Sequence, residues 1–433
     1  MRPLAPIEAI ILIYCDGTKT QAEVFAYARW WAEKYQLQEK DWENLKLLIA
    51  GFIRDKVLLK VSGPPAELPA YNINDFLTAR IPEPPPITRL EVPIGYGLIL
   101  TQKCRFHCKY CYAQTVALNR QEALISLPRL KEIFSETREL GIESIAISGG
   151  EPFLHPQIFE VIAELVNTGI SPAVSTKTPF SEPMIVRLVN TGLKRIQISL
   201  DSPNSEVVDN IVGVPGYFRS IVKTIEKLVA YGIKVRVNCV LIKETVKDVY
   251  ALCELLYRLG VRQVSFAPFS ANLAHYDLAL FPAQNDYGQV SVELARAQQD
   301  FPGLLVHYSH PLELEEKLRK MEVEWCSAGR FGFAVRPDGK VTICEQLTDD
   351  DFVVGDLNHQ SIIEVWYSEK MTAFRFPKRD YFKGTDCFLC DEFDECTKSR
   401  GRCYLRALLC FKRIYAPDPF CPRLQNRIVF KQW

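Results

Sequence analysis

The chain has 433 residues, of which 48% are hydrophobic, and its 52 basic and 52 acidic side chains give a formal net charge of zero. This balance excludes a general electrostatic attraction to nucleic acid or to an anionic membrane. The length allows several domains with sizeable cores. No secretory signal opens the chain and no apolar run reaches the roughly 20 residues that span a bilayer, so we expect a cytoplasmic protein. In a reducing compartment, clusters among the 14 cysteines are expected to bind metal or do redox chemistry rather than form disulfides.

Residues 1–62 are predicted to form a small helical domain that ends in a short strand. Thr20 is placed to cap the helix "QAEVFAYARWWAEKY", "KDWENLKLLIAGFIRDK" is a second amphipathic helix, and "VLLKV" is the strand. This domain can be a bundle without a function of its own. The turn "CDGTKT" and the closing "KVLLK" also make it similar to the winged-helix, PqqD-like modules that bind leader peptides, which implies peptide recognition. The proline-rich residues 63–92 are predicted to form an extended linker.

From residue 93 onward, strand-like runs alternate with amphipathic helices. The pattern predicts parallel β/α units, and Gly141, Gly169, Gly192, Gly232 and Gly260 are each placed to end a helix. No run resembling an eighth strand precedes the later cysteines. We therefore expect an α/β fold with a partial (β/α)6, TIM-like barrel over residues 93–310, with ligands at the carboxyl ends of its strands. Its six strands are expected at residues 96–100, 144–148, 172–176, 195–200, 234–242 and 263–269.

A cysteine motif follows the first of these strands. "LTQKCRFHCKYCYAQ" places Cys104, Cys108 and Cys111 in a C-x3-C-x2-C loop. Three thiolates in one loop can bind three irons of a [4Fe–4S] cluster and leave the fourth iron open. A closed zinc site needs a fourth ligand, for which His107 is the nearby candidate.

This motif, with an aromatic residue, Tyr110, before its third cysteine, resembles the radical S-adenosylmethionine (radical SAM) superfamily over roughly residues 95–300. The resemblance implies an enzyme in which SAM chelates the open iron. One electron then cleaves SAM to a 5′-deoxyadenosyl radical. "SGGEP" matches the family's GGEP motif, with Gly149 and Gly150 allowing close backbone approach and Glu151 pairing with the SAM ammonium.

Further strand ends fit the same resemblance. Ser175 and Thr176 are expected to face the SAM carboxylate, while Lys177, where relatives have Asn-Gly, either reaches that carboxylate or is solvated. Ser199 and Asp201 are expected at the ribose hydroxyls, or as a polar cap of the next loop. In "VDNIVGVPGYFRS" a valine stands where the family has a histidine, a change expected to affect packing rather than chemistry.

The remaining cysteines resemble the SPASM extension of radical SAM enzymes, which binds two auxiliary [4Fe–4S] clusters, and we assign it to residues 311–433. The resemblance implies one cluster on Cys326, Cys344 and Cys403, whose fourth ligand is either Cys410 or absent. The spacing Cys396-x6-Cys403 departs from the family by an insertion of three residues. The other cluster is implied on Cys387, Cys390, Cys396 and Cys421. A zinc ribbon on Cys387, Cys390, Cys396 and Cys403 is the rival interpretation.

Fewer signals point to residues that act on the substrate. Glu345 follows Cys344 where some relatives have a catalytic aspartate, so it is either a base or a solvated acid. Cys239 can be a hydrogen donor or, like Cys15 and Cys253, a buried small hydrophobe. Three further residues are candidates for the pocket wall: Tyr217, Asn238 and Arg336.

The resemblance implies a peptide maturase that oxidatively crosslinks side chains of a ribosomally made precursor peptide. It implies SAM and three [4Fe–4S] clusters as cofactors, and an electron donor such as flavodoxin or ferredoxin. A peptide epimerase or a backbone-excising enzyme is the alternative within radical SAM chemistry. An iron–sulfur scaffold without activity is the alternative outside enzymes.

Overall fold

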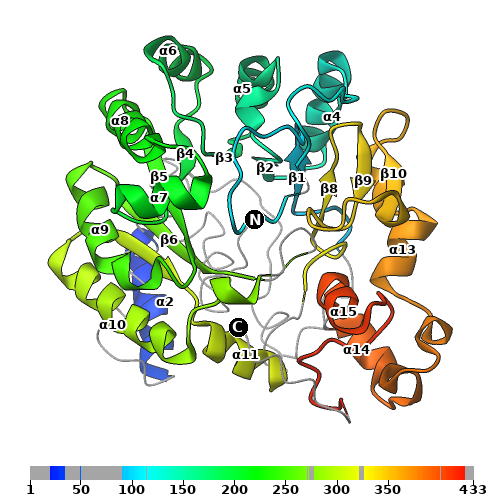
Figure 1. The fold of residues 1–433 in the computed structure, drawn as a ribbon. Coiled ribbons are helices and arrows are strands. Elements are labelled where there is room, and N and C mark those ends of the chain that lie inside the picture. The colour runs from blue at the N-terminus through cyan, green and yellow to red at the C-terminus, as the bar shows by residue number, and fades with distance from the viewer. Residues whose placement is uncertain are drawn as a thin grey trace. The chain divides into compact units, whose positions relative to one another are not determined.

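A computed structural model gives the fold of the chain (Figure 1). It describes residues 20–34, 49, 90–113, 115–270, 272, 277–320, 326–399 and 401–424. The chain divides into two compact units, Met1–Pro85 and Pro86–Trp433. Most of the predicted N-terminal module and most of the predicted linker lie outside the described residues.

In the first unit, the structure describes the predicted helix that Thr20 caps. Helix α2 (Gln21–Lys34) begins after Thr20, whose hydroxyl accepts a hydrogen bond from the Glu23 amide at 3.3 Å. The Glu23 carboxylate accepts in return from the Thr20 amide at 2.7 Å. Two of the otherwise unpaired amides at this helix start are therefore satisfied, and the predicted capping role of Thr20 is confirmed.

A curved sheet forms the centre of the second unit (Figure 1). Within its described residues ten strands pair in the order β10-β9-β8-β1-β2-β3-β4-β5-β6-β7, and the run from β8 to β7 is parallel throughout. The predicted α/β fold with a partial barrel is confirmed. The strands are β1 (Gly95–Ile99), β2 (Ser144–Ser148), β3 (Ala173–Thr176), β4 (Arg195–Ser199), β5 (Lys234–Leu241), β6 (Gln263–Pro268), β7 (Leu305–Tyr308), β8 (Gly332–Val335), β9 (Lys340–Thr342) and β10 (Val353–Asp356).

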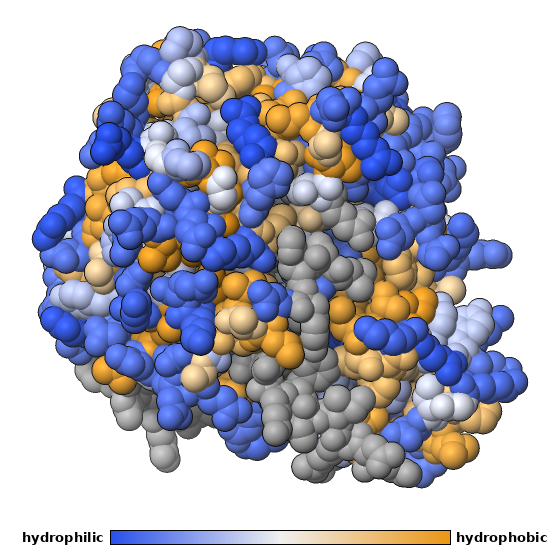
Figure 2. Space-filling view, in the orientation of Figure 1, coloured by the Kyte–Doolittle hydropathy of each residue, from blue (hydrophilic) through white to orange (hydrophobic). Residues whose placement is uncertain are grey.

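The helices that follow the strands lie outside the curve of the sheet (Figure 1). Hydrophilic side chains predominate along the rim of the face shown in Figure 2, where Figure 1 places these outer helices. The sheet is thus covered on its outer side, as expected for parallel strands joined by crossover helices. The outer helices are α4 (Leu127–Glu139), α5 (Ile158–Asn167), α6 (Glu182–Asn190), α8 (Tyr217–Ala230), α9 (Val249–Arg258) and α10 (Gln284–Asp300). Two further helices follow strands: α7 (Ser205–Val212), whose last carbonyls accept from the amides of His107 and Lys109, and α11 (Pro311–Arg319).

The ends of these helices follow the sequence closely. Each of the five glycines predicted to end a helix has a φ between 70° and 84°, a left-handed conformation that glycine adopts without a steric penalty. At the start of α8, both carboxylate oxygens of Asp209 accept amide hydrogen bonds, from Gly216 and Phe218. Val208, which replaces the family's histidine, is fully buried. Its role is packing, as predicted.

The strands β8–β10 extend the barrel sheet beyond β1. The sequence did not predict β7 or β8: β7 is short, and β8 pairs with a strand more than 200 residues away. Gly332 of β8 lies beside Gly95 of β1, and a Cβ on Gly332 would come closer than 3.0 Å to the Gly95 carbonyl oxygen. The rings of Tyr96 and Phe333, one residue further along, stack with centroids 5.2 Å apart. Small residues therefore allow the close approach, and an aromatic pair fills the adjacent space.

The C-terminal helices also contact the barrel. Glu136 of α4 accepts hydrogen bonds from the first two amides of α12, Ile362 at 2.7 Å and Ile363 at 3.4 Å. A carboxylate at a helix start is favourable because the free amides and the helix dipole are positive there. The remaining helices of this region are α12 (Ile362–Trp366), α13 (Glu369–Arg375), α14 (Phe393–Ser399) and α15 (Tyr404–Phe411).

Candidate functional site

The carboxyl ends of the first six strands surround a cavity of about 400 Å³. Residues from the loop after β1 and from the ends of the following strands line it together, as expected for a ligand site in a parallel sheet. The predicted residues on its wall are Cys104, Cys108, Tyr110, Cys111, Gly149, Gly150, Glu151, Ser175, Thr176, Lys177, Ser199 and Asn238. Other candidates lie elsewhere: His107 is exposed, Tyr217 is buried away from the wall, and Arg336 lines a separate cavity and binds Asp338 and Asp350.

Three thiols of one loop open on this cavity. Burial raises the pKa of Cys104 to about 11 and that of Cys108 to about 12, and it also raises the pKa of Cys111. The nearby Lys177 ammonium opposes the rise at all three. These thiols are protonated at neutral pH until a metal displaces the protons. Three thiols with an open side toward a cavity fit a [4Fe–4S] cluster that leaves one iron for a ligand.

The two glycines of "SGGEP" hold the next turn against the cysteine loop. A Cβ on Gly150 would come closer than 3.0 Å to the carbonyl oxygens of Gln102 and Lys103, and one on Gly149 would come equally close to that of Thr101. The amides of Gly150 and Glu151 donate to Thr101 and Lys103, both at 2.8 Å. The predicted close backbone approach is therefore made to the segment that carries the cysteines.

Glu151 is a buried carboxylate on the cavity wall, 2% exposed. Its oxygens accept hydrogen bonds from the Thr176 hydroxyl at 2.5 Å and from the Lys177 amide at 2.9 Å. Burial raises its pKa, and these hydrogen bonds oppose the rise. Thr176 and the backbone of the β3 end thus hold a carboxylate where an ammonium group of a ligand can pair with it.

Lys177 takes part in a buried network rather than being solvated. Its ammonium donates to the Tyr110 hydroxyl at 2.8 Å and lies 3.6 Å from the Asp201 carboxylate, to which the Tyr110 hydroxyl also donates. Burial lowers the pKa of Lys177, but Asp201 and the cluster thiols raise it, and the net shift is upward. The lysine is therefore charged, and its positive charge faces the cysteine loop.

Asp201 is 1% exposed and is not on the cavity wall. Its other carboxylate oxygen accepts from the Val240 amide at 2.9 Å. In this structure it acts on the cavity through Tyr110 and Lys177, and its predicted contact with ribose stays a prediction.

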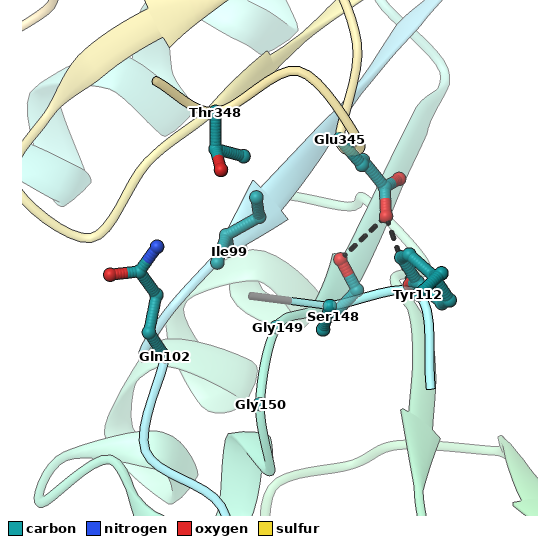
Figure 3. A pocket seen from close by; sticks show the side chains of 9 residues that line it. Ile99, Gln102, Tyr112, Ser148, Gly149, Gly150, Glu345 and Thr348 are labelled. Carbon is teal, nitrogen blue, oxygen red and sulfur yellow. Dashed lines mark hydrogen bonds between the residues drawn. The ribbon is translucent and has the colours of Figure 1, made fainter. Parts of the chain in front are cut away.

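Glu345 lies where the C-terminal region meets the barrel (Figure 3). Its carboxylate accepts hydrogen bonds from the Ser148 hydroxyl at 3.1 Å and from the Tyr112 hydroxyl at 3.2 Å. A Cβ on Gly97 would come closer than 3.0 Å to it, so β1 needs a glycine beneath this side chain. Glu345 is thus a fixed group rather than a freely solvated acid. Sequence reasoning missed Tyr112 and Ser148 as its partners because both contacts join segments about 200 residues apart.

A second cavity, of about 510 Å³, has Glu345 on its wall. Tyr112 and Gln346 line both cavities, and Cys326 and Cys344 line the second together with Glu345. The cavity at the thiol-bearing loop of the barrel and the cavity at the first predicted auxiliary set are therefore neighbours that share Tyr112 and Gln346 as wall residues.

The structure groups the auxiliary cysteines in two sets. The thiols of Cys326 and Cys403 are hydrogen-bonded to each other, which raises the pKa of Cys326 and lowers that of Cys403, and Cys344 lies near Cys403. The second set shares one small cavity and consists of Cys387, Cys390, Cys396 and Cys421. Cys403 is thus placed with Cys326 and not in a zinc ribbon with Cys387, Cys390 and Cys396.

The insertion before Cys403 has a defined role in this grouping. Gly401 has a φ of 69°, and a Cβ on it would come closer than 3.0 Å to the Cys326 carbonyl oxygen. The turn therefore passes directly against the first set. Cys410 lies two turns along α15 from Cys403, which is close enough for the two thiols to influence each other. Its role as a fourth ligand stays a prediction.

Two of the remaining cysteines are packing residues. Asn238 and Val240 of β5 line the cavity, whereas Cys239 between them is fully buried and its thiol donates to the Asp201 carbonyl at 3.3 Å. Cys253 is buried on α9. Cys15 lies outside the described residues.

Comparison with known proteins finds two domain families in the chain. Residues 98–256 match the radical SAM superfamily, and residues 326–391 match SPASM, an iron–sulfur cluster-binding domain. The chain carries a radical SAM domain followed by a SPASM domain. In the part of the chain that the structure describes, no helix is long and apolar enough to cross a membrane.

The curated proteins to which this chain is similar are distant in sequence. PqqA peptide cyclase from Rhizobium meliloti is 23% identical over 355 residues, which cover 80% of this chain and 92% of the relative. A probable GTP 3′,8-cyclase from Methanococcus maripaludis is 26% identical over 271 residues, 60% of this chain and 87% of the relative.

Solved structures share the fold. Streptococcus suis SuiB bound to its precursor peptide SuiA matches with a TM-score of 0.64 and 16% identity, covering 96% of this chain and 92% of SuiB. Native anSMEcpe with bound AdoMet matches with a TM-score of 0.53 and 17% identity, covering 74% and 93%.

Proposed function

We propose that this chain is a radical SAM peptide maturase. It cleaves SAM to a 5′-deoxyadenosyl radical and oxidatively crosslinks side chains of a ribosomally made precursor peptide. One observation carries the proposal: three thiols and the Glu151 carboxylate share a cavity that adjoins a second cavity at the first auxiliary set. The similarity to PqqA peptide cyclases and to the fold of SuiB supports a peptide as the substrate.

The cavity of the barrel is assigned to SAM and to a [4Fe–4S] cluster on Cys104, Cys108 and Cys111. When bound, the cluster supplies the electron that cleaves SAM. Glu151 pairs with the SAM ammonium, and its carboxylate is held in place by Thr176 and the Lys177 amide. The positive charge of Lys177 and the hydroxyls of Ser175 and Thr176 suit the SAM carboxylate, and Ser199 suits the ribose.

The two auxiliary cysteine sets are assigned to two further [4Fe–4S] clusters, which makes three in all. The four thiols of the second set complete a cluster, whereas the first set has three and takes either Cys410 or substrate at the fourth iron. Crosslinking removes hydrogen from the peptide, so electrons must leave the substrate, and clusters next to the second cavity can accept them. Flavodoxin or ferredoxin is proposed to reduce the barrel cluster.

Glu345 is proposed as the base that takes a proton from the substrate as the new bond forms. It lines the second cavity, and Tyr112, which lines both cavities, and Ser148 orient its carboxylate through their hydroxyls. Replacing Glu345 with Gln should slow peptide modification by roughly 10²–10⁴-fold, the usual contribution of a general base, while 5′-deoxyadenosine still forms. An unchanged rate of modification would remove Glu345 from the mechanism.

The remaining assignments follow from the same function. Residues 1–62 are proposed as a peptide-recognition module, 63–92 as a linker, 93–310 as the barrel and 311–433 as the SPASM region. A cytoplasmic location is proposed because cluster thiolates persist in a reducing compartment, and every cysteine that the structure describes is a free thiol.

Epimerisation is the second candidate reaction, and the position of Cys239 weighs against it. An epimerase returns a hydrogen atom to the substrate radical from a donor such as a thiol. Cys239 faces away from the cavity and donates to a backbone carbonyl. A scaffold without activity is also disfavoured, because it has no use for Glu151 and its partners on the wall of a cavity next to the cysteine loop.

The test is reconstitution of the full chain with iron, sulfide and reductant. Three clusters give about twelve irons per chain, and SAM should be cleaved to 5′-deoxyadenosine. With the precursor peptide encoded nearby, crosslinking lowers the peptide mass by two hydrogens. Epimerisation leaves the mass unchanged, and excision lowers it by more. No SAM cleavage in a fully loaded sample would refute the proposed function.

A further inference from the structure

Arg402 lies in the inserted segment between Cys396 and Cys403, where this chain departs from the SPASM spacing. It is 8% exposed, and its guanidinium donates to the Cys387 thiol and to the Thr397 hydroxyl, both at 3.4 Å. It lines the small cavity that the second set of cysteines shares. The insertion therefore brings a buried cation to the predicted ligands of the second auxiliary cluster.

Two aromatic rings fix this guanidinium. The rings of Phe382 and Phe393 lie 4.6 and 5.0 Å from it, and both rings are buried. Planar stacking on aromatic faces is a property of Arg that Lys does not share. The guanidinium, placed by the two rings, donates a hydrogen bond to the Cys387 sulfur.

Arg402 also differs in its charge partners from Arg406 and Arg423, two other arginines near these cysteines. Arg406 is bound by the buried Asp418 carboxylate, and Arg423, on the wall of the same cavity, pairs with Glu392. Arg402 forms no ion pair with a carboxylate that the structure describes, and the Cys387 thiol accepts a hydrogen bond from its guanidinium. A buried cation is costly unless an anion compensates it. The four cysteines, once ionised on a cluster, are the anions within reach.

We propose that Arg402 sets the reduction potential of the second auxiliary cluster by placing an uncompensated positive charge and an N–H donor against Cys387. This inference rests on the cluster assignment of the proposed function. Net charge and hydrogen bonds to sulfur are among the factors that set the potentials of iron–sulfur clusters. Reduction adds an electron, so a nearby cation and a donor to sulfur stabilise the reduced form and raise the potential. Arg402 is a positioning residue, because it acts through Cys387.

The test isolates the second cluster. The full-length background variant carries Cys104→Ala, Cys108→Ala, Cys111→Ala and Cys344→Ala and is reconstituted with iron and sulfide. It should hold about four irons, and its potential is measured by titration followed by electron paramagnetic resonance. In this background, Arg402→Gln should lower the potential with the iron content unchanged. Arg423→Gln is the matched control: this arginine lines the same cavity, but it is half exposed and already paired, so its loss should leave the potential unchanged.

An unchanged potential in iron-loaded Arg402→Gln overturns the inference. If Arg402→Gln loses its iron, Arg402→Met decides, because its long flexible side chain can fill the space between the two rings but carries neither charge nor N–H donor. A lowered potential in iron-loaded Arg402→Met supports the inference, and an unchanged potential overturns it. Loss of iron here too assigns Arg402 to building the site only and overturns the inference as well. A background that binds no iron contradicts the second cluster and this inference with it, whereas SAM cleavage by the wild-type chain tests the proposed function independently.

Discussion

The barrel site and the first auxiliary site are built in opposite ways. The three thiols of the barrel come from one short loop after β1, and the turn after β2 is hydrogen-bonded directly to that loop. The first auxiliary set instead joins Cys326 and Cys344, on either side of the β8–β9 hairpin, to Cys403 at the start of α15. A local loop keeps its ligands together through its own backbone, whereas the auxiliary set depends on the packing of separate segments. Damage to the fold should therefore affect the first auxiliary cluster before the barrel cluster.

The largest effect is expected from removing one of the three cysteines of the barrel site. Cys108→Ala should abolish formation of 5′-deoxyadenosine, because two thiols no longer hold a cluster with an open iron, while about eight of about twelve irons remain. Cys253→Ala is the control, since this buried cysteine lies on α9. Product analysis and iron counting on the same samples measure both effects. Loss of all iron would show that the auxiliary sites are not independent of the barrel site.

The next largest effect is expected from a substitution that disrupts the first auxiliary set without replacing any of its cysteines. Gly401→Ala puts a Cβ against the Cys326 carbonyl at a positive φ, so Cys326 and Cys403 must separate. We expect loss of about four irons and of peptide modification, with SAM cleavage retained. The measurement is iron content together with the two product assays. Full iron content in this variant would show that the first auxiliary set tolerates a displacement of its cysteines as well as the cysteine loop of the barrel does.

A smaller effect is expected on SAM binding in the barrel site, with the cluster of that site left intact. Glu151→Gln removes the negative charge from the cavity wall and should weaken SAM binding about 10- to 100-fold, or about 1.4 to 2.8 kcal/mol, as expected for a hydrogen bond to a charged group. Iron content should stay unchanged. Glu160→Gln is the control, because this exposed carboxylate pairs with Arg187 on the surface. Equal SAM affinities of the two variants would contradict the assignment of Glu151.

The smallest effect measures backbone strain apart from any site. Gly232 has a φ of 79° and no atom within 4 Å of an added Cβ, so Gly232→Ala should lower stability by about 1 kcal/mol through the left-handed conformation alone. The thermal midpoint should fall by a few degrees with all clusters loaded. The same loss of iron as in Gly401→Ala would mean that strain, and not the contact with Cys326, governs the first auxiliary set.

Sequence reasoning reached the parts of this molecule that are locally encoded. The first six barrel strands, the glycines that end their helices and the cap at Thr20 follow from periodicity and from the conformational freedom of single residues. The cysteine loop and its neighbouring strand ends were readable because parallel strands bring their carboxyl ends together. The contact of Tyr112 with Glu345, the pairing of β8 with β1 and the position of Arg402 were not predicted. Each depends on segments far apart in the chain and has no local signature.

The pairing of β8 with β1 has a consequence for anyone who would separate the two metal-binding regions. Truncation after the barrel would strip β1 of its neighbour and leave an unpaired, apolar strand edge, which is prone to aggregate. It would also remove α12, whose first amides bind Glu136 of α4. A chimera that exchanges auxiliary modules must therefore keep β8 through α12 with the barrel and join the foreign sequence after that point. The boundary at which the two regions can be separated therefore lies inside the C-terminal region and not at the end of the barrel.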